Sequence, residues 1–203
     1  MATRTISERR REELVLAAYR QIAEHGFEGL RTREVAAEVG VNIATLHYYF
    51  PTKEALIGAV LAHAMGRFRT TLSPHGSPSE QLRNYLRSVR KLLADEPELG
   101  GVMAELALRS VRDDSIGSIM NEMYDVWLTT MRGLLRRAVK AGALRPELDS
   151  DAVAALIVST LTAMTLPVMN DGKRGDLALR QLERWLGIGS SKARPAGGLD
   201  ASE

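Results

Sequence analysis

Apolar residues recur three or four positions apart along most of this chain, which is the spacing of an α-helix with one buried face. In the first helical stretch, for example, Leu14, Ala18 and Ile22 share one such face. No segment alternates apolar and polar residues for long enough to form a half-buried strand. The pattern therefore predicts an all-helical (all-α) fold of about nine helices.

Residues that favour helix ends predict where these helices begin and stop. Thr5 with Glu8, and Ser77 with Glu80, have the spacing of capping boxes. A side-chain oxygen at an N-cap accepts a hydrogen bond from a free backbone N–H of the first turn. Helices are therefore expected to start at Thr5, Thr32, Asn42, Thr52, Ser77 and Asp149, with further helices over 97–110, 115–141 and 176–186; the first should end at His25-Gly26, and the one after Thr52 at about Leu72.

The segment from Thr32 to Phe50 is predicted to form two short helices that meet at Gly40. A glycine after a helix can take the left-handed conformation that turns the chain sharply. Two short helices joined in this way have the shape of a helix-turn-helix, a motif that reads DNA. The residues expected to point outward on the second helix are small, polar or aromatic: Ile43, Ala44, Thr45, His47 and Tyr48.

The same region resembles the N-terminal signature of TetR-type (tetracycline-repressor-like) transcriptional regulators. The resemblance covers about residues 8–65. It is carried by Gly26-Phe27, Thr32-Arg33, Val35-Ala36, Gly40-Val41, Thr45-Leu46, Tyr48-Tyr49-Phe50 and Lys53-Glu54-Ala55-Leu56. The chain departs from the usual pattern at Asn42, where Ser is common, at Ala44, often Gly, and at His47, often Tyr. These departures concern the DNA sequence that is read rather than the type of domain.

The resemblance implies which residues touch DNA. It places Arg33, Ile43, Ala44 and Thr45 nearest the bases, with Asn42 at the start of the reading helix. Thr32, His47, Tyr49 and Lys53 are expected at phosphates. Two interpretations of Tyr48 stay open, a DNA contact and a ring packed inside the small domain. A two-fold dimer would then read an inverted repeat in double-stranded DNA.

Composition and charge narrow the class of protein. The chain of 203 residues has no cysteine, which excludes disulfides and thiolate metal sites and suits a reducing cytoplasm. The net charge is only +2, but basic residues cluster at Arg4, Arg9, Arg10 and Arg11, and Arg31, Arg33 and Lys53 bracket the motif. The four histidines are scattered, and no phosphate loop or nucleophile elbow is present. We therefore expect that the protein binds no metal and no cofactor and is not an enzyme.

A break at Ser73-Pro74-His75-Gly76-Ser77 divides the chain. Residues 1–75 are expected to form the DNA-binding domain, with the motif at about residues 31–50, and the fourth helix links it to a helical ligand-binding and dimerisation domain over 76–187. The remaining residues, 188–203, are rich in Gly, Ser and Ala and are predicted to be a disordered tail.

No charged residue occurs from Ala152 to Met169. The run approaches the length of a membrane span, but it contains Thr residues and Pro167 and lacks an aromatic belt, so no membrane is expected. A helix that is apolar on all sides must be covered on all sides. We expect a homodimer through this helix and the next, whereas an ordinary core helix of a monomer is the alternative. The predicted interface residues are Val153, Ile157, Thr160, Leu161, Leu182 and Trp185.

Methionines and aromatic residues are frequent in the larger domain and suit the wall of an apolar pocket. The predicted ligand-binding residues are Tyr85, Val89, Met103, Met120, Met123, Tyr124, Trp127, Met131 and Met164. Plain core is the alternative for each of them. The resemblance implies that an apolar or aromatic small molecule bound here alters the distance between the two DNA-reading heads.

The sequence thus favours a dimeric, ligand-responsive repressor that binds an inverted-repeat operator. The alternative is a helical sensor or interaction protein that no longer recognises an operator, and the departures at Asn42, Ala44 and His47 are the reason for keeping it.

Overall fold

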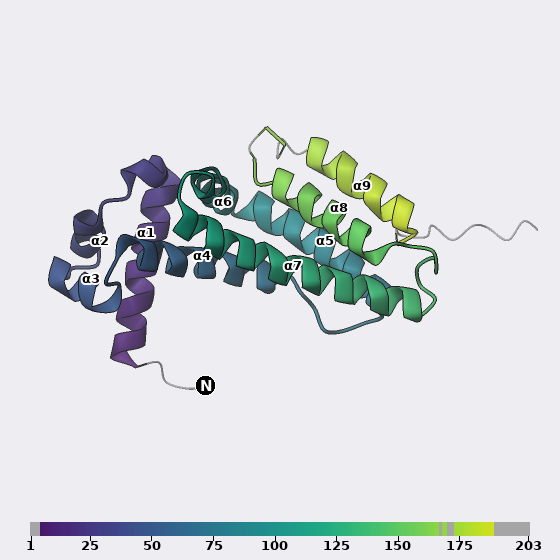
Figure 1. The fold of residues 1–203 in the computed structure, drawn as a ribbon, viewed down its shortest axis with the longest axis horizontal. Helices are drawn as coiled ribbons and strands as arrows, with labels where there is room; N and C mark the ends of the chain where they lie inside the picture. Colours follow the sequence, from purple (N-terminus) through teal and green to yellow (C-terminus); the bar gives the residue numbers. More distant parts are fainter. Residues whose placement is uncertain (1–4, 167, 170–172, 189–203) are drawn as a thin grey trace, which may run out of the picture.

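The computed structural model describes residues 5–166, 168–169 and 173–188, and all of its regular structure is helical. Figure 1 shows a small head of three helices at one end and a longer body of packed helices at the other. The helices of the described residues are α1 (Ile6–Gly29), α2 (Thr32–Glu38), α3 (Ile43–Tyr49), α4 (Lys53–Arg69), α5 (Pro78–Asp95), α6 (Pro97–Ser110), α7 (Asp114–Lys140), α8 (Ser150–Ala163) and α9 (Arg174–Leu186). The predicted all-helical fold is confirmed.

Most of the predicted caps are present. Thr5 and Ser77 form complete capping boxes with Glu8 and Glu80. Asn42, Thr52 and Asp149 accept hydrogen bonds from backbone N–H groups of the first turns of α3, α4 and α8. Thr32 was expected to be a cap, and that prediction is wrong. It is the first residue of α2, after Arg31, and α2 begins without a side-chain cap.

Two helices end differently from the prediction. The helical assignment of α1 continues to Gly29, although Gly26 (φ 70°, ψ 177°) breaks its geometry where the sequence places the end. The uncharged run after Ala152 is not one long helix, because α8 stops at Ala163. The hydroxyl of Thr165 there donates to the carbonyl of Thr162 (2.8 Å), and a proline follows at position 167, which disfavours helix in the residue before it.

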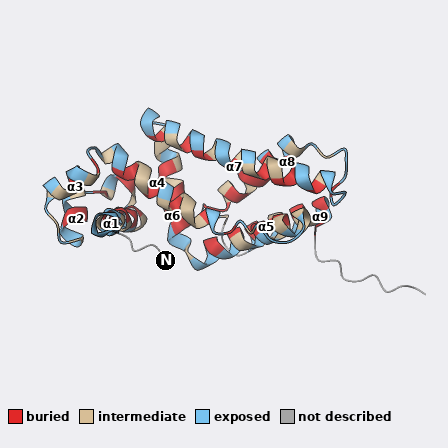
Figure 2. Ribbon diagram, turned by 90° about the horizontal axis from the view of Figure 1, so that it is seen from below, coloured by how far each residue is buried: buried red, intermediate tan, exposed pale blue. Residues whose placement is uncertain are grey.

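Head and body share one apolar core. The buried side chains form a single cluster that runs from α1 to α9 (Figure 2). The helix α4 supplies Leu56, Ile57, Val60, Leu61 and Ala64 to this core, all at 2 % exposure or less. Two helices join the parts: α4 contacts α1 on the head side and α6 and α7 on the body side, and α1 itself packs directly on α6.

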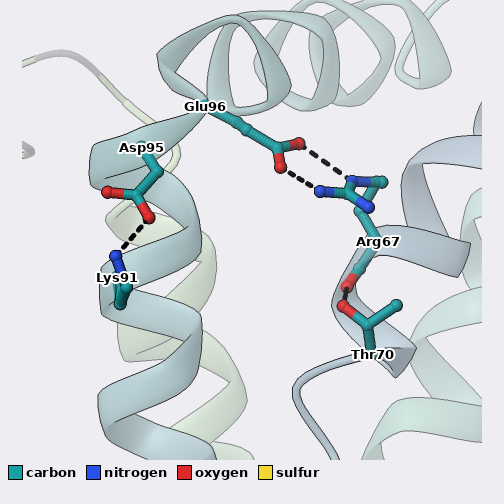
Figure 3. A network of polar contacts seen from close by, with 5 residues as sticks. All are labelled: Arg67, Thr70, Lys91, Asp95 and Glu96. Atoms are coloured by element: carbon teal, nitrogen blue, oxygen red, sulfur yellow. Dashed lines mark hydrogen bonds and ion pairs between the residues drawn. The ribbon is translucent and has the colours of Figure 1, made fainter.

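A polar contact fixes α4 against the next pair of helices (Figure 3). The guanidinium of Arg67 forms two hydrogen bonds with the carboxylate of Glu96, at the junction of α5 and α6; one of them, from Nε to Oε2, is 2.9 Å long. The carboxylate raises the pKa of Arg67.

A ring contact joins α1 to α4. Tyr19 of α1 packs edge-on against His63 of α4. Burial, together with the acidic residues Glu98 and Glu96, raises the pKa of the Tyr19 hydroxyl.

The C-terminal end of the described chain is anchored. Gly187 takes a left-handed conformation (φ 70°), and the N–H of Ile188 donates to the carbonyl of Glu183 (3.0 Å). Ile188 is buried, and Arg83 of α5 donates to its carbonyl. The predicted disordered tail therefore does not begin at residue 188, because this side chain belongs to the core. The remainder of that tail, 189–203, lies outside the described residues, as does Arg4.

Candidate nucleic-acid interface and ligand pocket

The turn between α2 and α3 has the geometry that the sequence indicates. Gly40 takes a left-handed conformation (φ 71°), and the N–H of Val41 closes the turn on the carbonyl of Ala36 (2.9 Å). Val35, Leu46 and Phe50 are buried at 1 % exposure or less, so α2 and α3 pack together through one apolar face each. The outer face of α3 is therefore available to a partner.

The predicted DNA-contact residues lie at the start of α2, on α3 with its cap, and at the start of α4. Arg33, Asn42, Ala44, His47 and Tyr48 are exposed, and Thr32, Ile43, Thr45, Tyr49 and Lys53 are half-buried. Tyr48 is 79 % exposed and stands edge-on to Tyr49, with 5.2 Å between the ring centroids. Of the two interpretations of Tyr48, the one with a ring packed inside the domain is wrong.

Asn42 organises the start of α3. Its Oδ1 atom accepts hydrogen bonds from the backbone N–H of Thr45 (2.8 Å) and from the Thr45 hydroxyl (2.9 Å). The unusual residue at position 42 thus does what the more common serine would do, which is to cap the helix. The other two departures, Ala44 and His47, both lie on the exposed surface of α3.

The N-terminal arginines mostly hold the head together. Arg10 donates to the carbonyl of Val39 (3.2 Å) and pairs with Glu13, and Arg9 pairs with the same carboxylate (3.0 Å). The guanidinium of Arg11 lies over the ring of Phe50, 4.9 Å from its centroid. The contacts of Arg10 with Val39 and of Arg11 with Phe50 join α1 to the helix-turn-helix, whereas the pairs with Glu13 lie within α1.

The start of α4 presents a cation beside the motif. Lys53 is the first residue of α4, and Thr52 caps that helix. The Nζ atom of Lys53 lies 5.0 Å from the centroid of the Phe27 ring. Free backbone N–H groups at a helix N-terminus favour an anion, and a lysine at the same place adds a full positive charge.

A cavity of about 360 Å³ lies between α4 and α7, with Tyr85 of α5 as part of its wall. Its size falls in the range of pockets for small molecules. Most of its lining is apolar, with one cation and one anion: Gly58, Leu61, Ala62, Met65, Phe68, Arg69, Leu72, Tyr85, Ile119, Glu122, Met123, Val126, Trp127 and Thr130.

A buried hydrogen bond shapes the cavity wall. The indole N–H of Trp127 donates to the hydroxyl of Tyr85, and both side chains are at most 8 % exposed. Burial raises the pKa of this hydroxyl, so Tyr85 is neutral. Phe68 packs at a tilt against Trp127, with 5.9 Å between their centroids, and extends the aromatic surface.

Three of the nine predicted ligand-binding residues line this cavity: Tyr85, Met123 and Trp127. Five others are buried core side chains outside its lining: Val89, Met103, Met120, Met131 and Met164. Tyr124 lines a separate surface groove between α7 and α8. The six do not line the cavity because their positions on the helices turn them toward other neighbours.

The sequence interpretation missed the contribution of α4. Leu61, Met65, Phe68 and Leu72 have helical spacing, which predicts only a packing face. This spacing was the available signal, but it does not distinguish a helix face that lines a cavity from one that packs against other side chains.

The predicted dimer residues divide into two groups. Val153, Ile157 and Leu161 are at most 6 % exposed and lie in the core of the protomer itself, so their assignment to an interface is wrong. They face inward because α8 packs on α7 and α9 through this side of the helix. The other three, Thr160, Leu182 and Trp185, line a surface groove, although Leu182 is only 5 % exposed and also belongs to the core. The groove further includes three residues absent from the prediction: Leu156, Ala178 and Gln181. Trp185 is 51 % and Leu156 43 % exposed.

Within the described ranges, no group of three or more His, Cys, Asp or Glu residues has the arrangement of a metal site. In that same part of the chain, no helix is both long and apolar enough to span a membrane.

Two family models match the chain. Residues 14–60 match "Bacterial regulatory proteins, tetR family", and residues 72–168 match "Tetracyclin repressor-like, C-terminal domain". The first covers the helix-turn-helix and the start of α4, and the second covers α5 to α8, including α7 on the far side of the cavity from α4. Together they span most of the chain.

Similar proteins agree with these models. The chain is 26 % identical to the fatty acid metabolism regulator protein of Bacillus subtilis over 172 residues, which are 82 % of this chain and 88 % of that protein. A TetR transcriptional regulator from Chloroflexus aurantiacus has the same fold (TM-score 0.77, 23 % identity, 89 % of this chain and 96 % of that one). The transcriptional regulator FadR of Bacillus subtilis, solved in complex with stearoyl-CoA, also has this fold (TM-score 0.71, 24 % identity, 87 % of this chain and 98 % of that one).

Proposed function

The chain belongs to the TetR family of bacterial regulatory proteins, and we propose that it is a dimeric repressor that a small apolar ligand releases from DNA. The observation that carries the proposal is the exposed outer face of α3, beside the capped and positively charged start of α4. Residues 1–75 would bind DNA, and residues 76–187 would bind the second subunit and, together with α4, the ligand.

The surface of the head supports sequence-specific binding. Phosphate contacts supply affinity, whereas contacts to base edges supply specificity. Arg33, Ile43, Ala44 and Thr45 are the residues assigned to the bases, and Thr32, His47, Tyr49 and Lys53 are assigned to the phosphates. Thr45 has a methyl group for a thymine methyl, and its hydroxyl already bonds to Asn42.

The surface of α8 and α9 supports dimerisation. Leu156 and Trp185 are large apolar side chains that stand exposed on adjacent helices. Two copies of such a helix pair make a four-helix interface with two-fold symmetry. That symmetry places two heads on one inverted repeat.

The cavity between α4 and α7 supports an apolar effector. We assign the effector to this site because its lining is mostly apolar and because α4 also carries Lys53 of the head. The stearoyl-CoA complex of the Bacillus subtilis structure makes a long-chain acyl thioester the first compound to test. A ligand releases the protein only if it binds better to the dimer geometry that does not fit DNA.

Selection of duplexes from a random pool tests the DNA-binding part. The full-length protein should enrich an inverted repeat, and the enriched duplex should bind at least 10³-fold better than a scrambled one. An enriched sequence without two-fold symmetry would contradict the dimer on DNA. If no sequence is enriched while light scattering shows a dimer, the protein is an interaction protein or a sensor instead.

Tryptophan fluorescence tests the cavity. In a Trp185→Phe protein the remaining indole is Trp127, which lines the cavity. Stearoyl-CoA should change its emission with saturation and lower the affinity for the selected duplex, and coenzyme A without the acyl chain is the control. The same change in a Met65→Arg protein, whose cavity is obstructed, would place the compound elsewhere.

A further inference from the structure

The corner between α1 and α2 is held by the body of the molecule. Gly26 turns the chain with a left-handed φ of 70°, and the next N–H, that of Phe27, donates to Oε2 of Glu105 in α6 (3.1 Å). The neighbouring Glu28 pairs with Arg109, one turn later in α6 (3.2 Å). A helix of the body therefore contacts two consecutive residues of the head, Phe27 and Glu28.

The Phe27 ring lies between α6 and the start of α4. It is only 6 % exposed, with the guanidinium carbon of Arg109 4.8 Å and the ammonium of Lys53 5.0 Å from its centroid. A cation at this distance from an aromatic ring is attracted by the electron-rich face. Within the described part of the chain Lys53 forms no ion pair, so the ring is the group that holds its ammonium.

The position of this ammonium matters because Lys53 is the first residue of α4 and lies beside the motif. A lysine side chain loses rotamer freedom when it is fixed on a phosphate. A ring that already restrains the ammonium reduces that loss when DNA binds. The contact also runs from α6 through Phe27 to Lys53, which joins the body to the DNA-binding surface.

We propose that Phe27 is a positioning residue for DNA binding: α6 fixes the Phe27 backbone through Glu105 and contacts the ring through Arg109, and the ring holds the ammonium of Lys53 in place for a phosphate. This inference rests on the proposed DNA-binding function. Phe27 does not touch DNA in this arrangement and acts only through Lys53.

Binding to the selected duplex tests the proposal in a double-mutant cycle of Phe27→Leu and Lys53→Ala. Lys53→Ala should lower the slope of log K against log salt by about 0.9, the value for one phosphate. Phe27→Leu should weaken binding about two- to fivefold when Lys53 is present, the effect of an exposed cation–π contact. It should have no further effect when Lys53 is already replaced by alanine.

Matched variants separate positioning from a general structural role. Phe27→Tyr keeps the ring and should bind as the wild type does. Glu105→Ala removes the acceptor for the Phe27 N–H, so it should weaken binding when Lys53 is present and have no further effect in the Lys53→Ala background. Glu105→Gln keeps an acceptor oxygen and should bind as the wild type does. The Glu105 pair also provides the test if Phe27→Leu does not fold, which thermal unfolding would reveal.

Equal weakening by Phe27→Leu in the wild-type and Lys53→Ala backgrounds would overturn the proposal, because the ring would then act on the fold alone. An unchanged salt slope in Lys53→Ala would overturn it as well. In both cases the wild type still selects its duplex, so these failures are distinct from a wild type that enriches no DNA.

Discussion

Single side chains at the start of α3 already have the arrangement that a DNA reader needs. The Oδ1 atom of Asn42 accepts hydrogen bonds from both the N–H and the hydroxyl of Thr45. The methyl group is then the part of the Thr45 side chain that is left for a contact with DNA. A methyl group in the major groove distinguishes thymine from the other bases. Thr45 is therefore the residue that we expect to contribute most to the choice of DNA sequence.

Replacement of Thr45 should alter which duplexes are preferred more than how tightly DNA is bound. Thr45→Ser keeps the hydroxyl bond to Asn42 and removes the methyl, so it should lose preference at one base pair of each half-site, by about 1–3 kcal/mol. Competition between the selected duplex and its single-base variants measures this. An unchanged order of preference would show that the methyl group does not read a base.

A second prediction concerns the buried pair of Tyr85 and Trp127. Tyr85→Phe leaves the indole N–H without its acceptor, which should lower the free energy of unfolding by about 1–3 kcal/mol. In a Trp127→Phe background no indole needs an acceptor, so removal of the Tyr85 hydroxyl should cost little there. Urea unfolding of the four proteins gives both values, and equal costs in the two backgrounds would exclude an energetic coupling.

At the scale of the helix, hydrogen bonds at the ends decide the boundaries. The start of α5 is the clearest case, since the carboxylate of Glu80 accepts from the N–H (2.8 Å) and the hydroxyl (2.8 Å) of Ser77. These bonds lower the pKa of Glu80. A carboxylate whose pKa is lower in the folded state stabilises that state above its unfolded pKa and loses this effect as the pH falls through the folded value.

Glu80→Gln should accordingly lower the melting temperature at pH 7, and the difference from the wild type should shrink as the pH falls from about 5 to about 3. Glu54→Gln is the control, because Glu54 is also in the first turn of a helix but its carboxylate forms no hydrogen bond within the described structure. Thermal unfolding followed by circular dichroism across this pH range is the measurement. A difference that grows toward acid pH would contradict the capping role.

At the scale of the whole molecule, the helix α4 contributes residues both to the DNA-binding head and to the cavity. The start of α4 presents Lys53, and positions farther along it, Met65 and Phe68, line the cavity. A molecule bound in the cavity therefore touches the same helix that carries Lys53, the residue proposed to contact a phosphate. This arrangement is what a ligand-responsive DNA-binding protein requires.

The exposed groove of α8 and α9 leads to a prediction about assembly. Leu156→Glu should shift the protein from dimer to monomer in size-exclusion chromatography with light scattering, because it places a charge in the apolar centre of the proposed interface. Leu108→Glu is the matched control, since Leu108 is 62 % exposed on α6, away from the groove. A dimer that persists in Leu156→Glu would move the interface to another surface.

The sequence by itself determined the helices, the turn and the type of domain. These depend on residues close together in the chain: Ser77 with Glu80 for a cap, Gly40 for a turn, and apolar side chains every three or four positions for a buried face. Such interactions are local, and for this reason most helix starts were predicted correctly. Three differ: Thr32 is the first residue of α2 rather than its cap, and α7 and α9 begin one and two residues before the predicted positions 115 and 176.

Only the tertiary structure decided which neighbour each face meets. Ile157 and Trp185 belong to apolar stripes alike, yet one is in the core and the other is at the surface, because the packing of α8 and α9 selects the inward side. The same holds for Met123 at the cavity and Met120 in the core, and for Phe27, which meets Lys53 and Arg109 only in the folded chain. Periodicity records that a side chain is buried, whereas its partner is set by contacts between distant residues, which no local pattern contains.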